Sequence, residues 1–240
     1  MYKRQPRDHA ALGAEEALSL EGGWRRQFSS ALSADAALFF NRYHHLRGGM
    51  LREQPITGVP QALQCLANPT AAPGVCYFTM SGYNANVGRA NSWGGEFSLD
   101  WQPKPWWRLR AAYSYLRVKG EMTDDSLGNT QVEYFENSAP RYQVLFNNNF
   151  SLAHDLNLDV RLRRNSSTAH YLINDLRLTK VPAYTGLDMR LAWLTQRHLE
   201  LSVMGRNLLK KRHVEFINIM PSMAVHEVHR SLLLQAVMRY

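Results

Sequence analysis

The chain has 240 residues, of which 45% are hydrophobic and 20% are charged, and its formal net charge is +8. This balance is typical of a folded protein and excludes a disordered one. No run of about 18 apolar residues occurs, which excludes a transmembrane helix but not membrane strands, because those are short and only half apolar. Residues 1–18 contain no apolar core segment, so we expect no secretory signal in this chain.

The excess of positive charge does not collect into a nucleic-acid-binding motif. The basic residues are scattered through alternating segments, as with Arg108 and Arg110 or Arg161 and Arg163. A nucleic-acid-binding protein usually gathers such residues in a block or a recognised motif. We therefore expect no nucleic-acid partner.

A strict alternation of apolar and polar residues recurs along the chain and predicts strands. Successive side chains of a strand leave on opposite faces, so each segment has one apolar and one polar face. In chain order, nine strands and no helix are predicted, at about 18–28, 32–40, 93–101, 107–115, 142–150, 156–162, 186–193, 199–205 and 232–240. The polar faces would carry Asp159, Arg161, Arg163, Asp188, Arg190, Glu200, Arg206 and Arg239.

The predicted connections alternate between short and long. The short ones lie near 29–31, 103–105, 154–155 and 195–198, and the long ones at about 47–90, 118–139, 165–182 and 209–227. Short turns at one rim and long loops at the other are typical of an outer-membrane barrel. A soluble sandwich usually has turns every 8–12 residues or so without this asymmetry. The connections favour the barrel.

Large aromatic side chains gather next to the short turns. They are Trp24, Phe28, Trp101, Trp106, Trp107 and Trp193. Amphipathic rings at one level suit a girdle at a membrane interface. The alternative is that they close one end of the core of a soluble sandwich.

The two cysteines, Cys65 and Cys76, lie in a segment rich in proline and glycine. Their closeness favours a disulfide that clips a surface loop in an oxidising compartment, and the alternative is two unrelated thiols. The spacing of cysteines and histidines that zinc usually needs is missing, so we expect no metal site and no cofactor.

The last third of the chain contains the motif "VPAYTGLDMRLAWLTQRHLELSVMGRNLLKKRH" and a last strand that ends "LLLQAVMRY". These motifs resemble the C-terminal end of TonB-dependent outer-membrane receptors. Upstream, "EEALSLEGGWRRQFSSALSADAALFFNRYHHLRG", "GGEFSLDWQPKPWWRLRAAYSYL" and "SAPRYQVLFNNNFSL" fit later barrel strands of the same family, in the same order. The terminal aromatic residue Tyr240, with Met238 and Ala236 before it, resembles the signal read by the barrel-assembly machinery.

The resemblance implies an all-β fold, namely antiparallel transmembrane strands that form the C-terminal portion of a barrel of about 22 strands. Residues 1–240 are expected to be one partial barrel domain, because nothing in them resembles the family's N-terminal plug domain or its energy-coupling box. An open sheet in lipid would leave two costly unpaired edges, so we expect a C-terminal fragment. The implied location is the outer membrane of a Gram-negative bacterium, and the implied partners are its lipid, the assembly machinery and, through a plug, the TonB energy-coupling protein.

The resemblance also implies uptake of a scarce ligand, such as a ferric siderophore or another iron complex, without covalent chemistry. Candidate ligand contacts lie in the long segment 47–90, where Tyr77, Phe78, Tyr83 and Arg89 mix aromatic and cationic groups that suit an anionic aromatic chelate. No catalytic residue is expected.

Two alternatives remain open at this point. One is a soluble β-sandwich that binds a ligand such as a carbohydrate. The other is a small outer-membrane barrel enzyme that would use His198, Ser202 and Asn207.

Overall fold

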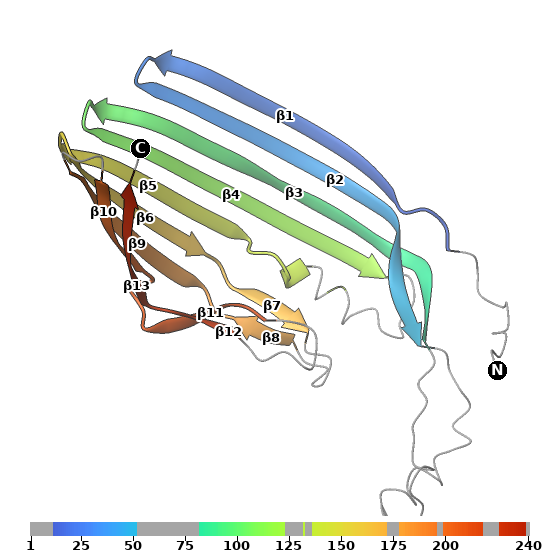
Figure 1. Cartoon of the computed structure of the whole chain (residues 1–240). Helices are drawn as coiled ribbons and strands as arrows, with labels where there is room; N and C mark the ends of the chain where they lie inside the picture. The colour runs from blue at the N-terminus through green and yellow to red at the C-terminus, as the bar shows by residue number, and fades with distance from the viewer. Residues whose placement is uncertain are drawn as a thin grey trace, which may run out of the picture.

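The structure is a computed structural model that describes residues 12–51, 82–122, 132, 136–171, 178–195, 199–217 and 226–238. Its main feature is a curved antiparallel sheet of nine strands (Figure 1). In spatial order these are β1 (Glu16–Ser29), β2 (Leu32–Leu51), β3 (Gly82–Lys104), β4 (Trp107–Met122), β5 (Tyr142–Ala153), β6 (Leu156–Asn165), β9 (Tyr184–Leu194), β10 (Leu199–Arg206) and β13 (Ser231–Met238). All nine predicted strands are confirmed.

Two further pairs of short strands lie in segments that were predicted to be connections. They are β7 (Thr168–Tyr171) with β8 (Leu178–Val181), and β11 (Arg212–Phe216) with β12 (His226–His229). Glu136 and Asn137 are helical, whereas the sequence predicted no helix. Among the described residues, no helix is long and apolar enough to span a membrane.

The two ends of the sheet differ as the sequence predicted. Tight turns join β1 to β2, β3 to β4 and β5 to β6 at one end, which we call the short-turn end (Figure 1). The opposite end, the long-connection end, holds the start of β1 and the two small sheets. The last strand, β13, ends at the short-turn end.

The two faces of the sheet differ in chemistry because the strands keep their register. Apolar residues stand opposite apolar residues across neighbouring strands, as with Leu20 and Phe40, or Phe146 and Leu162. We call this the convex face. Its side chains are strongly exposed: Leu38 is 70% exposed and Leu234 is 74% exposed. None of the described residues covers this face with a second large sheet, so the arrangement is not that of a sandwich.

A small packed core lies instead at the long-connection end. The buried apolar residues Ala169, Val181, Tyr184 and Ile217 come from β7, β8, the start of β9 and the end of the β11 segment. Strands β8 and β11 contact each other there. The connections at this end therefore pack on each other and give the sheet a structured rim.

Candidate functional site

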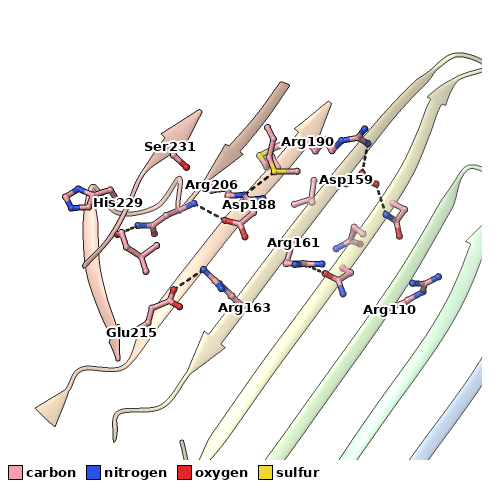
Figure 2. Close-up of a pocket in the computed structure, with 18 residues that line it drawn as sticks. Arg110, Asp159, Arg161, Arg163, Asp188, Arg190, Arg206, Glu215, His229 and Ser231 are labelled. Atoms are coloured by element: carbon pink, nitrogen blue, oxygen red, sulfur yellow. Dashed lines mark hydrogen bonds and ion pairs between the residues drawn. The ribbon is translucent and has the colours of Figure 1, made fainter. Parts of the chain in front are cut away.

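The concave face of the sheet is polar and forms a hollow of about 690 Å³ (Figure 2). Strands β4, β5, β6, β9 and β10 supply its floor, and the β11–β12 pair supplies one wall. We call this feature the concave hollow. Its charged lining consists of Arg110, Asp159, Arg161, Arg163, Asp188, Arg190, Arg206 and Glu215.

Strand register places several of these side chains in one row across the sheet. Arg110 stands opposite Asn147, Asn147 opposite Arg161, and Arg161 opposite Asp188. Neighbouring strands are about 4.8 Å apart, so the row brings side chains from four strands onto one surface. Residues that are far apart in the sequence thus share one water-facing surface.

The carboxylates that line the hollow are already engaged. Asp159 accepts hydrogen bonds from Asn149 Nδ2 (2.6 Å) and Arg190 Nη1 (3.5 Å). Arg190 also donates from Nη2 to Glu200 Oε1 at 2.5 Å. Asp188 Oδ1 accepts the backbone N–H of Asn207 at 2.8 Å. These contacts satisfy the acidic groups and leave the arginines in excess.

Among the described residues, two arginines of the hollow have only uncharged partners. Arg161 Nε donates to the amide oxygen of Asn147 at 2.9 Å, and Arg206 Nε contacts the sulfur of Met204 at 3.2 Å. Both residues are exposed. A guanidinium group carries five donors in a planar fork that matches a carboxylate or a phosphate. The concave hollow can therefore accept an anionic group.

The β11–β12 pair is fastened to the sheet by a cluster around Glu215. Glu215 Oε1 accepts from Arg163 Nη2 at 3.0 Å and contacts His213 Nε2 at 2.8 Å. The ring of His213 lies against that of Tyr184, with centroids 4.6 Å apart. Arg163 can reach Glu215 because Gly186 lies beneath it: a Cβ on Gly186 would come within 2.7 Å of Arg163 Nε.

Two buried nitrogen atoms of this cluster have no hydrogen-bond partner among the described residues. They are Arg163 Nε and His213 Nδ1. Buried polar groups are normally paired with protein or ordered water, so the edge of the hollow keeps unused hydrogen-bonding capacity. In the part of the chain that the structure describes, no group of three histidine, cysteine or acidic residues could hold a metal ion.

Asn207 joins the end of β10 to two neighbouring elements. It is fully buried and has a φ of 52°, a left-handed conformation that asparagine tolerates better than most residues. Its backbone N–H donates to Asp188, and its Nδ2 donates to the carbonyl oxygen of Val228 in β12 at 3.0 Å. The Asn207 amide is thus a structural clamp, and Ser202 lies apart from it on the concave face of β10.

Several residues singled out from the sequence lie outside the described residues. They are Cys65, Cys76, Tyr77, Phe78, His198 and Tyr240. Tyr83 is described only through its backbone, which pairs with Met50 in β3 and β2. Ala236 and Met238 lie in β13, opposite Leu201 and Leu199. The suggested roles of all these residues remain predictions.

Arg89 is described, and it does not face the concave hollow. It alternates with Asn91 and Trp93 on the convex face of β3, where it stands opposite Glu121 of β4. The sequence predicted that the arginines of the hollow lie on one polar face, because they alternate with apolar residues. It did not predict that Glu215 and His213 join them, because no alternation in the sequence indicates that β11 folds over the sheet.

The aromatic residues next to the short turns form contacts at one level of the sheet. Trp107 stacks on Phe150 with centroids 5.9 Å apart, and Trp24 meets Phe28 at 5.9 Å. The indole N–H of Trp107 donates to Asn148 and that of Trp193 to Asp155, at 3.0 and 2.8 Å. Trp107 and Trp193 thus each have an apolar ring on the convex face and a hydrogen-bonded indole N–H.

A family model described as "TonB dependent receptor-like, beta-barrel" matches residues 5–208. The chain belongs to this family. No curated protein matches the chain. The match includes eight of the nine strands of the main sheet and therefore rests on the body of the fold.

Solved structures of this family's kind share the fold. The ferric-catecholate import receptor Fiu from E. coli superposes with a TM-score of 0.64 at 19% identity, over 92% of this chain and 27% of that chain. The ferripyoverdine receptor of the outer membrane of Pseudomonas aeruginosa gives 0.60 at 14% identity, over 92% and 27%. The copper transporter OprC gives 0.61 at 15% identity, over 94% and 32%. The chain therefore spans less than a third of the length of these proteins.

Proposed function

We propose that this chain is the C-terminal part of the barrel of an outer-membrane TonB-dependent receptor that takes up a ferric siderophore or another iron complex. The proposal rests on one observation above all. The sheet has an uncovered apolar face, a polar opposite face, short turns at one end and long connections at the other. Lipid is the solvent that makes such an uncovered apolar face stable.

The edges of the sheet support a role as one part of a larger barrel. Nine strands pair in antiparallel order, so β1 and β13 run in the same direction. Closure into an antiparallel barrel needs an odd number of further strands, and the first and last of these must run the opposite way. A second copy of this chain in the same membrane orientation would place β1 parallel to β13 and does not meet that need. We infer that additional receptor strands close the sheet.

The charge of the concave hollow favours an anionic ligand. Its arginines exceed its carboxylates, and neither Arg161 nor Arg206 has a charged partner among the residues that the structure describes. Iron chelates often carry negative charge, and guanidinium groups in a narrow, water-filled barrel would attract them. Tyr77, Phe78 and Tyr83 remain further candidates for ligand contact. The energy-coupling protein would act through a plug domain, and the assembly machinery would read the last strand.

The test is uptake of radioactive iron by cells that express the whole receptor gene containing this chain. Iron is supplied as a catecholate chelate or as a pyoverdine chelate, and copper uptake is measured in parallel. We expect energy-dependent uptake of one iron chelate, and we expect the double variant Arg161→Gln, Arg206→Gln to slow it several-fold. Uptake of copper but not of iron would overturn the choice of ligand, and recovery of the protein in the soluble fraction would overturn the receptor role.

A further inference from the structure

An ion pair between Arg163 of β6 and Glu215 of β11 fastens the β11–β12 pair to the concave sheet and also lines the concave hollow (Figure 2). Both side chains are half-buried. Nearer to β10, the Asn207 amide holds the same pair through the carbonyl oxygen of Val228. We call the residues that lie beyond this contact the outer part of the pair: Val214, Glu215 and Phe216 of β11, with His226 and Glu227 of β12.

Glu215 is an incomplete partner for Arg163. Both of its contacts use one oxygen atom, because Oε1 accepts from Arg163 Nη2 at 3.0 Å and also contacts His213 Nε2 at 2.8 Å. The Nε atom of Arg163 has no hydrogen-bond partner among the described residues. An anion binds a guanidinium group most strongly when it accepts from two of its N–H groups at once. Arg163 is therefore an anion site that Glu215 fills only in part.

Other contacts hold Arg163 in place independently of Glu215. Its side chain lies across Gly186, where β9 has no side chain to fill the space, and its guanidinium carbon is 6.0 Å from the centroid of the Tyr184 ring. On the other side, register places the apolar residue Leu145 opposite Arg163. These contacts would keep the guanidinium at the edge of the hollow if Glu215 moved away. An exchange of partners therefore needs no rearrangement of β6.

Arg163 also lies beside an arginine that faces the hollow without a carboxylate partner. Arg161 and Arg163 are two residues apart on the same face of β6, so their Cα atoms are about 7 Å apart. Arg161 is exposed, and its Nε donates to the amide oxygen of Asn147. A ligand with several negative groups that binds at Arg161 is within reach of Arg163. The ligand and Glu215 then compete for one guanidinium.

We propose that Glu215 is a built-in competitor for the ligand: an anionic group of the iron chelate replaces Glu215 on Arg163, and the outer part of the β11–β12 pair is released from the sheet. Departure of Glu215 alone would leave a half-buried charge without compensation, which is costly. An incoming anion removes that cost, so occupation of the hollow and release of the outer part occur together. An uncharged chelate cannot make this exchange. The inference rests on the proposed uptake of an iron chelate.

The β11–β12 pair contains a matched control for this contact. Glu227 of β12 forms an ion pair with Arg212 of β11 at 3.2 Å, which joins the two strands to each other. Among the described residues that line the hollow, Glu227 is absent. Glu215→Gln and Glu227→Gln therefore remove the same charge from the same two strands, but only Glu215→Gln removes the competitor at Arg163.

The first test measures binding to de-energised cells that express the whole receptor gene containing this chain. Radioactive iron is supplied as a tris-catecholate chelate, which is strongly anionic, or as a tris-hydroxamate chelate, which is uncharged. We expect Glu215→Gln to bind the catecholate about fivefold more tightly than the wild type and the hydroxamate equally well. Glu227→Gln should bind both as the wild type does. In an Arg163→Gln background, Glu215→Gln should bring no gain, because the two residues act on one contact.

The second test follows release of the outer part with a spin label on Phe216→Cys, in the whole receptor with all other cysteines changed to serine. Phe216 is exposed, so the label does not disturb a packed side chain. Gallium replaces iron in both chelates because it is diamagnetic and leaves the spectrum of the label undisturbed. We expect the gallium tris-catecholate, but not the tris-hydroxamate, to increase the mobility of the label. Glu215→Gln should increase it without any ligand, which a purely structural contact would also do, so the response to the anionic chelate is the deciding observation.

The outcomes separate this inference from the proposed function. Equal gains in affinity for Glu215→Gln and Glu227→Gln, a gain that persists without Arg163, or a label whose mobility does not rise with the anionic chelate would overturn the inference. Binding of the hydroxamate alone by wild-type cells would also overturn it and would leave uptake of an iron complex standing. Binding of neither chelate would contradict the proposed function, and this inference would fail with it.

Discussion

At the scale of single residues, Asn207 links three strands of the structure. It combines a left-handed backbone, complete burial and hydrogen bonds to two other strands. From the sequence, Asn207 was only a candidate for the amide group of a possible enzyme site. The structure shows it clamping β10 to β9 and β12.

We predict that Asn207→Ala lowers the free energy of unfolding by about 2–3 kcal/mol, because alanine tolerates this φ poorly and leaves the carbonyl oxygen of Val228 unpaired. The measurement is urea titration of the full chain in detergent micelles. Glycine tolerates this φ but lacks the amide group. The free energy of unfolding of Asn207→Gly should therefore lie between those of the wild-type chain and Asn207→Ala. Asn157→Ala, at the exposed start of β6, removes only an exposed hydrogen bond accepted from Ser151 and should change stability by less than about 0.5 kcal/mol. An effect of Asn207→Ala no larger than that of Asn157→Ala would contradict the clamp.

Gly94 is required by a close approach between β3 and β4. A Cβ at this position would lie 2.0 Å from the carbonyl oxygen of Tyr115 and 2.7 Å from the ring of Phe39. The first contact is with backbone, so no side-chain rotation relieves it. We predict that Gly94→Ala costs about 3 kcal/mol, measured in the same urea titration.

Gly22 offers a matched control for this substitution. It lies in β1 of the same sheet, and an added Cβ would meet no atom within 4 Å. Gly22→Ala should therefore leave the urea midpoint almost unchanged. Equal losses for the two variants would show that the effect is general to strand glycines rather than due to the contact at Gly94.

At the scale of elements, β13 tests which solvent each face meets. Leu234 is 74% exposed on the convex face, and its neighbour Gln235 is exposed on the concave face. In water, arginine at either exposed position would be nearly neutral. In lipid, arginine on the outer face costs about 2–4 kcal/mol near the middle of the bilayer.

We therefore predict that Leu234→Arg reduces the stability of the vesicle-inserted chain by about 2–4 kcal/mol, whereas Gln235→Arg has little effect. Urea-dependent release from phosphatidylcholine vesicles measures both. Two harmless substitutions would indicate that water meets both faces of β13.

The alternation of apolar and polar residues predicted the strand segments that have one apolar face. It did not predict the segments in which neither face is apolar. The alternation of Leu38 and Phe40 placed β2, and that of Phe97 and Leu99 placed β3. In the structure β2 extends to Leu51 and β3 begins at Gly82, so both strands enter the segment 47–90 that was predicted to be a long connection. These extensions are rich in glycine and asparagine, which are depleted in strands and more typical of loops.

The small sheets could not be predicted for a related reason. Strands β7, β8, β11 and β12 have four or five residues each, too few for a periodic signal. They are held by contacts between distant segments, such as Arg163 with Glu215. The site was thus predictable as a polar face and not as a walled hollow.

At the scale of the whole molecule, the central question is which solvent covers the convex face. The nine strands, the aromatic residues next to the short turns and the concave hollow all agree with a barrel wall between lipid and water. A soluble sandwich would require the convex face to be packed against protein. A side chain that faces lipid is accessible to dissolved oxygen, one that faces water is accessible to water-soluble ions, and one that is packed against protein is accessible to neither.

The most direct test is site-directed spin labelling of four consecutive residues in β4, Ala111 to Ser114. Each is changed in turn to cysteine in a Cys65→Ser, Cys76→Ser background, with the full chain in phosphatidylcholine vesicles. We predict that labels at Ala111 and Tyr113 collide mainly with oxygen, and that labels at Ala112 and Ser114 collide mainly with a water-soluble nickel complex. High nickel access at all four positions, or low access to both agents at Ala111 and Tyr113, would contradict a membrane-facing wall.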